Sequence, residues 1–145
     1  MGDTIEGRIG PLSSFLRACF VDSMELEGAN WTSDFAEQFL SRRGYDIRPW
    51  LPFTMFKVGR LGDVLDFDYG CKKGEEFQNQ VDRARYDFEL TKAELLDERF
   101  TKVYQEWCSS RGIKSRMQSY GRGFFIEESS MRMDIPEGES WTTNW

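Results

Sequence analysis

Two acid-bearing segments, one near each end of the chain, are the positions best suited to chemistry. Asp22 and Glu25 follow a short apolar run near the start, and Glu137 and Glu139 follow another near the end. Both runs are typical of β-strands that end in a loop. In α/β barrels, catalytic groups project from the carboxyl ends of the strands, and two carboxylates facing each other there can cleave a glycosidic bond. The pattern therefore favours a glycoside hydrolase.

The glutamates can divide the catalytic roles between them. An inverting glycosidase needs a protonated acid and an ionised base, with carboxyl groups about 6.5–9.5 Å apart to admit a water. Glu25 is the candidate acid, because partial desolvation beside Met24 and Leu26 favours a protonated carboxyl. Glu137 and Glu139 share a face of an extended segment, so either can be the base. We favour Glu139 as the base and Glu137 as a sugar or metal ligand; the reverse order, or merely exposed glutamates, is the alternative.

Five further residues are candidates for substrate binding: Asp22, Asn30, Trp31, Gln118 and Tyr120. Asp22 can orient the candidate acid or hold a sugar hydroxyl, and capping of the following loop is the alternative. Gln118 and Tyr120 end a predicted strand on one face, where both can hydrogen-bond a substrate. Asn30 and Trp31 lie in the loop after the first strand. Trp31 can stack on a sugar ring, or pack at the start of the next helix.

The composition narrows the classes of partner. The 145 residues carry a net charge of −6 and no long basic run, whereas binding to a phosphate backbone needs clustered lysine and arginine. No apolar stretch is long enough to span a bilayer, and no apolar segment of the secretory type follows Met1. We therefore expect neither a nucleic acid nor a membrane as a partner.

The absence of histidine narrows the chemistry. Without it, the chain cannot supply a Ser-His-Asp or Cys-His catalytic group or a histidine-based zinc site. Cys19, Cys71 and Cys108 are odd in number and lack the spacing of metal ligands, so neither a disulfide framework nor zinc is indicated.

The candidate residues depend on an alternation of strands and helices. We predict strands at 16–23, 113–120 and 132–136, and helices at 32–44 and 74–109, with mixed signals over 53–73. Thr32 is the predicted N-cap of the first helix, while Gly44 and Gly112 end the two helices. This order predicts parallel strands. Because three parallel strands cannot close a barrel and would leave two exposed edges, residues 1–145 are predicted to be an α/β segment of something larger.

The apolar positions of the long helix are mostly three or four residues apart. They are Phe77, Val81, Ala84, Phe88, Leu95, Phe100, Val103 and Trp107. This spacing is typical of an amphipathic helix that packs one face against a core.

A connected series of motifs carries a family resemblance. In chain order they are Asp22-Ser23-Met24-Glu25, Gly28-Ala29-Asn30-Trp31-Thr32, Arg42-Arg43-Gly44-Tyr45-Asp46, Pro49-Trp50-Leu51-Pro52, Gly112-Ile113-Lys114-Ser115-Arg116 and Asp134-Ile135-Pro136-Glu137-Gly138-Glu139. Together they resemble the α-L-rhamnosidases of glycoside hydrolase family 106, over most of the chain.

The resemblance implies a large multidomain enzyme whose catalytic domain is a (β/α)₈ TIM barrel, so that residues 1–145 are an α/β fragment, a partial TIM barrel with about three parallel strands. It implies hydrolysis of terminal α-L-rhamnosyl residues of plant polysaccharides or glycosides, with inversion, and a calcium ion near the sugar. It also implies a secreted or periplasmic protein. No EF-hand spacing is present, so the calcium ligands are not identified, although Asp22, Glu25, Glu137 and Glu139 could supply oxygen atoms.

Two other functions remain open at this stage. One is a retaining barrel glycosidase acting on another sugar, with carboxyl groups only about 5–5.5 Å apart. The other is a non-catalytic carbohydrate-binding module that uses the aromatic residues, which make up 15% of the chain. We expect residues 1–145 to be inactive in isolation.

Overall fold

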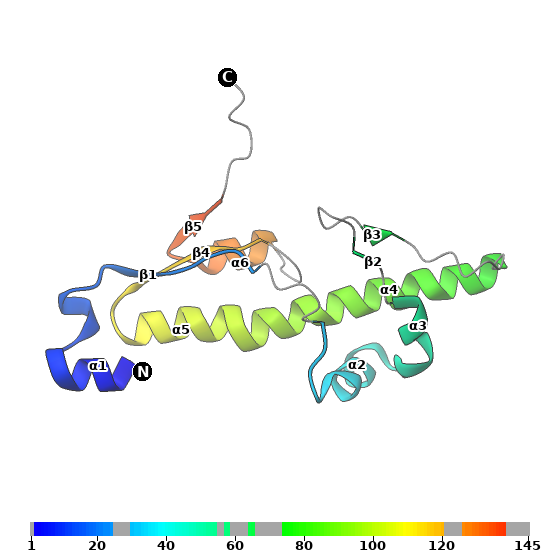
Figure 1. The fold of residues 1–145 in the computed structure, drawn as a ribbon, viewed down its shortest axis with the longest axis horizontal. Helices are drawn as coiled ribbons and strands as arrows, with labels where there is room; N and C mark the ends of the chain where they lie inside the picture. The colour runs from blue at the N-terminus through cyan, green and yellow to red at the C-terminus, as the bar shows by residue number, and fades with distance from the viewer. Residues whose placement is uncertain are drawn as a thin grey trace, which may run out of the picture. The chain divides into compact units, whose positions relative to one another are not determined.

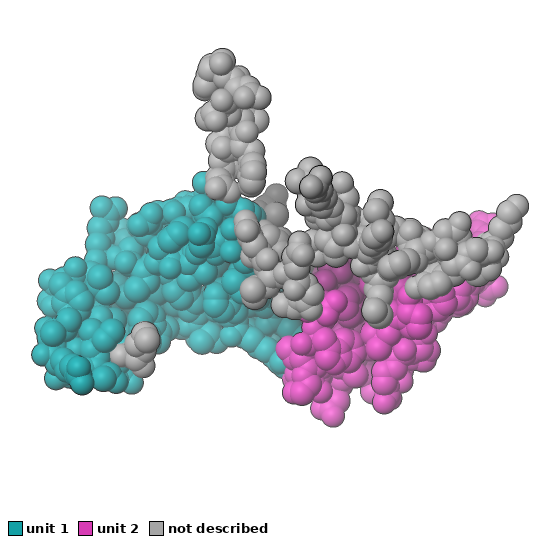
Figure 2. All heavy atoms as spheres, viewed as in Figure 1, with its two compact units in different colours: residues 1–29, 93–145 teal, residues 30–92 magenta. Residues whose placement is uncertain are grey.

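The computed structural model describes residues 2–24, 30–54, 57–58, 64–65, 74–120 and 126–138. The chain divides into two compact units (Figure 2). The first comprises Met1–Ala29 and Ala93–Trp145, and the second comprises Asn30–Lys92. The second boundary, between Lys92 and Ala93, therefore lies inside a helix, α4 (Glu75–Leu96).

A three-stranded parallel sheet is the centre of the first unit (Figure 1). Its strands are β1 (Ala18–Val21), β4 (Lys114–Gln118) and β5 (Ile135–Glu137), with β4 between the other two. Both pairings are parallel, as predicted. Strands β1 and β4 are neighbours in the sheet, but the whole second unit lies between them in the sequence.

Helix α5 (Lys102–Ser110) packs against one face of this sheet. Its Tyr104 hydroxyl donates hydrogen bonds to the carbonyl oxygens of Cys19 on β1, at 2.6 Å, and Arg116 on β4, at 3.2 Å. Burial, the largest cause, raises the pKa of Tyr104 above its usual range. Ser115 and Met117, which alternate with Arg116, are fully buried. The helix therefore covers the odd-numbered face of β4.

The opposite face of the sheet is much more open. Phe20 is 47% exposed, and the Arg116 side chain is 41% exposed. Arg116 lies between Phe20 and Ile135 in the register, so residues of all three strands share this face. The sheet thus has one packed face and one face that presents side chains to solvent.

The third strand starts later in the chain than predicted. Arg132 ends helix α6 (Ile126–Arg132), where its guanidinium binds Asp97 through two hydrogen bonds of 2.9 Å. The Met133 amide then donates to the Ser130 carbonyl, which closes the helix. The strand predicted at 132–136 is therefore present, but its predicted start was wrong, because Arg132 belongs to α6, a bend follows at 133–134, and β5 begins only at Ile135.

The long predicted helix is present with one irregularity. It consists of α4 (Glu75–Leu96), a π-helical segment η3 (Asp97–Thr101) and α5, and Gly112 follows with a φ of +64°. The predicted apolar positions Val81, Ala84, Phe88 and Leu95 are buried, whereas Phe77 and Val103 are exposed. The 3.6-residue pattern predicted the helix but not the π segment, which shifts the later residues around the axis.

The second unit packs two short helices against α4. Helix α2 (Phe35–Arg43) ends at Gly44, whose φ of +79° is the left-handed conformation expected of a C-cap glycine. Asp34, rather than the predicted Thr32, occupies the N-cap position, and the Thr32 hydroxyl donates to the Asp34 carboxylate at 2.8 Å. The predicted helix is thus confirmed, with a later start.

Aromatic and polar contacts hold the second unit together. Phe35 and Phe39 are buried, and Phe35 lies against Phe88 of α4. The Tyr45 hydroxyl donates to the Asp87 carboxylate at 2.8 Å, and burial followed by this bond raises the pKa of Tyr45 above its usual range. The remaining elements are η2 (Arg48–Trp50), α3 (Leu51–Thr54) and an antiparallel pair, β2 (Lys57–Val58) and β3 (Val64–Leu65).

The chain begins with two helical elements that the sequence pattern did not predict. They are α1 (Gly2–Ile9) and η1 (Leu12–Ser14). Arg111 forms an ion pair with Asp3, and Leu12 packs with Cys108 and Ile113 in a small core. Within the described residues, no helix combines the length and apolar character that crossing a membrane requires.

Candidate active site

Polar candidates from all three parallel strands meet at the carboxyl edge of the sheet. Asp22 directly follows β1, Gln118 ends β4 and Glu137 ends β5. Gln118 is the register partner of Glu137, and Met117 is the partner of Val21. The sequence therefore placed these three residues correctly at one edge, which is where active sites form in sheets of parallel strands.

Glu137 is held by an arginine from the neighbouring strand. Both Nε and Nη2 of Arg116 contact the same carboxylate oxygen, Oε1 of Glu137. The guanidinium carbon also lies 5.4 Å from the centre of the Phe20 ring on β1, within the range of a cation–π contact. Charge-assisted hydrogen bonds of this kind are stronger than neutral ones, so the pair fixes the position of the Glu137 side chain.

Arg116 contacts a predicted site residue, but the sequence predicted no role for it. It entered only as the last residue of one family motif. The sequence does show that Arg116 stands two positions before Gln118, so that both side chains lie on the same face of the predicted strand. That placement does not reveal the partner, because the pair depends on the register between β4 and β5.

A cavity of about 410 Å³ borders this ion pair. It is lined by Arg17, Ala18, Arg116, Ile135 and Glu137, which come from all three strands of the sheet and the residue before β1. The lining contains two cations and one anion. The open face of the sheet therefore combines space with charged hydrogen-bonding groups.

Gln118 and Tyr120 form a second polar pair at the same edge. The Tyr120 hydroxyl donates to Gln118 Oε1 at 2.8 Å, and the Met24 amide donates to the Tyr120 carbonyl at 3.3 Å. The side-chain amide oxygen of Gln118 accepts the bond from Tyr120. The side-chain NH₂ group of Gln118 is therefore the donor that the pair can offer to a ligand. The two residues predicted to bind substrate thus contact each other.

Asp22 makes a local contact. Its Oδ1 atom accepts a hydrogen bond from the Ser23 amide at 2.9 Å, and the residue is exposed. This is the loop-capping contact that was the alternative for this aspartate. Asp22 lies at the carboxyl edge of the sheet, and its Oδ2 atom takes no part in the bond to Ser23.

Asn30 and Trp31 belong to the second unit, whereas the other described candidates belong to the first. Asn30 is exposed. The Trp31 ring lies 4.7 Å from the Phe35 ring, centroid to centroid, and remains 45% exposed. Trp31 therefore makes the packing contact at the start of α2 that was the alternative to sugar stacking, while one part of its ring stays accessible.

The predictions for Glu25 and Glu139 fall outside the described residues. Their roles as acid and base, and the distance between their carboxyl groups, stay predictions.

The described residues do not fit the calcium ion that the family resemblance implies. Among them, no group of three or more acidic or cysteine side chains could hold a metal ion. Calcium takes six to eight oxygen ligands, and the carboxylate of Glu137 already contacts the Arg116 guanidinium, a competing cation. We therefore assign no metal to these residues and no chemical step to a metal.

Asp134 lies at the opposite, amino end of β5. Its Oδ2 atom accepts hydrogen bonds from the Ser115 amide at 2.8 Å and the Ser115 hydroxyl at 2.9 Å. The backbone bond is the largest cause that lowers the pKa of Asp134, followed by the hydroxyl bond. These contacts join the start of β5 to β4, which is a structural role.

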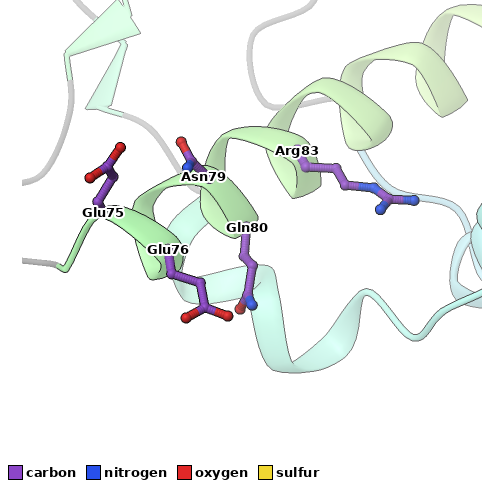
Figure 3. Close-up of a pocket in the computed structure, with 5 residues that line it drawn as sticks. All are labelled: Glu75, Glu76, Asn79, Gln80 and Arg83. Atoms are coloured by element: carbon purple, nitrogen blue, oxygen red, sulfur yellow. The ribbon is translucent and has the colours of Figure 1, made fainter.

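A larger depression on the second unit lacks the features of an active site. It measures about 580 Å³ and is lined by Glu75, Glu76, Asn79, Gln80 and Arg83, all on α4. Figure 3 shows that these side chains do not converge, with Glu75 and Glu76 pointing to different sides of the helix. We therefore place the candidate active site at the sheet edge.

The fold and the site define an α/β protein with a polar, carboxylate-containing site at the carboxyl edge of parallel strands. Comparison with known proteins supplies the family. The family model Glyco_hydro_106, alpha-L-rhamnosidase, matches residues 2–145, so the chain belongs to this family of glycoside hydrolases.

Two relatives support this assignment. The structure of a rhamnosidase from Novosphingobium sp. PP1Y is 29% identical, with a TM-score of 0.55, and covers 83% of this chain and 10% of that one. A protein named "Putative beta-glucuronidase" from Formosa agariphila is 26% identical over 124 residues, 86% of this chain and 9% of that protein. The chain thus spans about a tenth of the length of these relatives.

Proposed function

We propose that the protein containing these residues hydrolyses terminal α-L-rhamnosyl glycosidic bonds with inversion at the anomeric carbon. The match to the rhamnosidase family over residues 2–145 supports the substrate class. The observation that carries the proposal is the carboxyl edge of the sheet, where Glu137 lies beside Gln118 in the register and is held by Arg116.

The proposed architecture is part of a (β/α)₈ barrel. Two features of the first unit support it: the strands are parallel, and helix α5 covers only one face of the sheet. In a barrel, the helices lie outside and the other face of each strand points to the interior. The open face with Phe20, Arg116 and Glu137 would then face the interior, with Glu137 near the catalytic end.

The proposed reaction uses two carboxyl groups on opposite sides of the sugar. Glu25 donates its proton to the leaving oxygen as the bond to the anomeric carbon breaks. Glu139 takes a proton from a water whose oxygen attacks the same carbon from the other side, so the configuration inverts. The acid ends as a carboxylate and the base as a carboxylic acid, and a proton passes to solvent and back between turnovers.

Glu137 binds a sugar hydroxyl in this scheme. Its carboxylate, which forms an ion pair with Arg116, accepts a hydrogen bond from that hydroxyl. The Gln118 amide donates to a neighbouring hydroxyl, with Tyr120 fixing its orientation. Trp31 belongs to the second unit, and the accessible part of its ring is a separate candidate surface for stacking on a sugar.

Calcium dependence of the whole protein is a separate proposal, based on the family resemblance. Incubation with EDTA should lower the activity, and added CaCl₂ should restore it. Full activity after exhaustive chelation would contradict this proposal.

The decisive experiment is an assay of the whole protein on an aryl α-L-rhamnoside, with NMR detection of the first anomer released. Glu25→Gln and Glu139→Gln should each abolish turnover. Glu106→Gln is the matched control, because Glu106 is an exposed glutamate of α5 whose nearest ionic contact, to Lys102, is 4.0 Å. Activity unchanged in both site variants would refute the proposal.

The same assay separates the alternatives. An aryl β-glucuronide is tested in parallel, because one relative carries a beta-glucuronidase name. Release of the retained anomer would indicate the covalent, retaining route. Binding of rhamnosides without turnover in the unmodified protein would indicate a carbohydrate-binding module.

A further inference from the structure

We propose that Arg116 is a positioning residue, which orients the Glu137 carboxylate toward the substrate. The inference rests on the proposed function, since it assumes a sugar at the carboxyl edge of the sheet. Arg116 itself is not proposed to touch the reacting atoms.

The contacts of Arg116 span all three strands. From the central strand β4, its guanidinium lies over Phe20 of β1 and binds Glu137 of β5. Phe20 is the register partner of Arg116, whereas Glu137 is the partner of Gln118, so the arginine reaches diagonally along the sheet toward its carboxyl edge. The aromatic ring fixes the guanidinium on one side and the carboxylate is held on the other.

The ion pair engages Glu137 through a single oxygen. Nε and Nη2 of Arg116 both contact Oε1, and Oε2 takes no part in the pair. Holding Oε1 at a defined place restricts the positions that Oε2 can occupy, because both oxygens are bonded to the same carbon. The arrangement thus orients an acceptor that the arginine itself does not occupy.

A second arginine pair in the same unit shows a different geometry. Arg132 binds Asp97 through two separate bonds, Nε to Oδ1 and Nη2 to Oδ2, each of 2.9 Å. Both carboxylate oxygens are therefore used, and the pair joins α6 to the π-helical segment. The two arginine side chains are nearly equally exposed, 41% for Arg116 and 43% for Arg132, so they form a matched comparison.

Space for a ligand lies beside the pair on the open face of the sheet, and its lining extends to Arg17 and Ala18 at the start of β1. The cavity of about 410 Å³ is bordered by Arg116 and Glu137, and its size lies in the range of small-molecule sites. Arg132 and Asp97 line neither of the cavities described above. A positioning role therefore belongs to the first pair, and a structural role to the second.

The test compares Arg116→Gln, Arg116→Lys, Glu137→Gln and Arg132→Gln in the whole protein, assayed on an aryl α-L-rhamnoside. Arg116→Gln should lower kcat about 10–100-fold, with a smaller change in KM, because a small misplacement of a positioned group is costly in the transition state. Arg116→Lys should restore only part of kcat, since a lysine keeps the charge but lacks the planar fork. Arg132→Gln should leave kcat unchanged.

A variant that carries both Arg116→Gln and Glu137→Gln tests whether Arg116 acts through Glu137. If Arg116 acts through Glu137, then Arg116→Gln should add little to the loss caused by Glu137→Gln. Full multiplication of the two losses would overturn the inference. If Arg116→Gln fails to fold, Arg116→Lys decides: a lowered kcat at an unchanged melting temperature supports the inference, and wild-type kcat overturns it.

Failure of this inference differs from failure of the proposed function. Wild-type kcat in Arg116→Gln or in Glu137→Gln, together with inactive Glu25→Gln and Glu139→Gln, would overturn only the role of Arg116. Wild-type activity in Glu25→Gln and Glu139→Gln would overturn the proposed function, and the inference with it.

Discussion

The two edges of the parallel sheet use carboxylates in different ways. At the amino edge, Asp134 accepts bonds from the amide and hydroxyl of the buried Ser115. At the carboxyl edge, among the described residues, the Glu137 carboxylate contacts a side chain instead of the backbone, namely the guanidinium of Arg116. A carboxylate tied to the backbone fixes the fold, whereas one held by another side chain can be aimed at a ligand. The same division would be expected if the sheet belongs to the proposed barrel, because barrel enzymes carry their catalytic groups at the carboxyl ends of the strands.

The largest expected effect tests the carboxyl edge. Glu137→Gln in the whole protein should lower kcat about 100-fold, because it removes the anionic acceptor proposed for a sugar hydroxyl. The measurement is steady-state hydrolysis of an aryl α-L-rhamnoside, alongside the melting temperature. A large fall in melting temperature with unchanged kcat would make Glu137 a structural residue and remove the contrast between the edges.

The next largest effect tests the amino edge. Asp134→Ala should destabilise the junction of β4 and β5 by about 1–3 kcal/mol, because it leaves the buried amide and hydroxyl of Ser115 without their acceptor. Hydrogen–deuterium exchange of a peptide covering residues 113–120 measures this locally. Asp134→Asn is the control, since it keeps an oxygen acceptor. Unchanged exchange in Asp134→Ala would contradict the structural role.

The lowered pKa of Asp134 predicts how this junction responds to acid. A carboxyl whose folded-state pKa is depressed stabilises the fold above its unfolded pKa of about 3.9, and that stabilisation is lost as pH falls through the folded pKa. Protection of residues 113–120, corrected for intrinsic exchange rates, should therefore fall below about pH 4 in the wild type. Asp134→Asn should lack this dependence, and an equal fall in both proteins would argue against it.

A smaller effect tests the packed face between the edges. Tyr104→Phe removes the hydroxyl that donates to the Cys19 and Arg116 carbonyl groups, and should cost about 1 kcal/mol of local stability. Exchange of peptides from β1 and β4 measures the loss. Phenylalanine keeps the ring, so protection equal to the wild type would show that water replaces the hydroxyl at no cost.

The smallest effect is expected from the structural arginine pair. Arg132→Gln should cost about 0.5 kcal/mol, because a partly exposed ion pair gains little over its solvated groups. Exchange of a peptide from α6 provides the measurement. A loss as large as that of Asp134→Ala would show that the pair is a main support of this unit.

Local patterns in the sequence predicted the three parallel strands, the two main helical stretches and several members of the candidate site. The 3.6-residue spacing predicted the helical stretch that contains α4 and α5, and Gly44 and Gly112 ended helices as expected. The alternation of elements predicted parallel strands, which placed Gln118 and Glu137 at one edge. These features depend on neighbours in the chain, so a single sequence contains enough information for them.

Several details depended on distant contacts instead. The π-helical segment at Asp97–Thr101 and the late start of β5 are associated with the contact between Arg132 and Asp97, which lie far apart in the chain. The N-terminal helix is held by the ion pair between Asp3 and Arg111. No local pattern contains these pairings, and helix or strand propensity is too weak to decide such boundaries.

By itself, the sequence determined the chemistry available to this protein: carboxylates after strand-like segments, no histidine, and motifs of the rhamnosidase family. The tertiary structure alone decided which of these groups meet. Arg116 gained its role only when β4 and β5 paired in parallel with Gln118 opposite Glu137. The physical reason is that side chains on neighbouring strands come within reach through the register of backbone hydrogen bonds, whatever their separation along the chain.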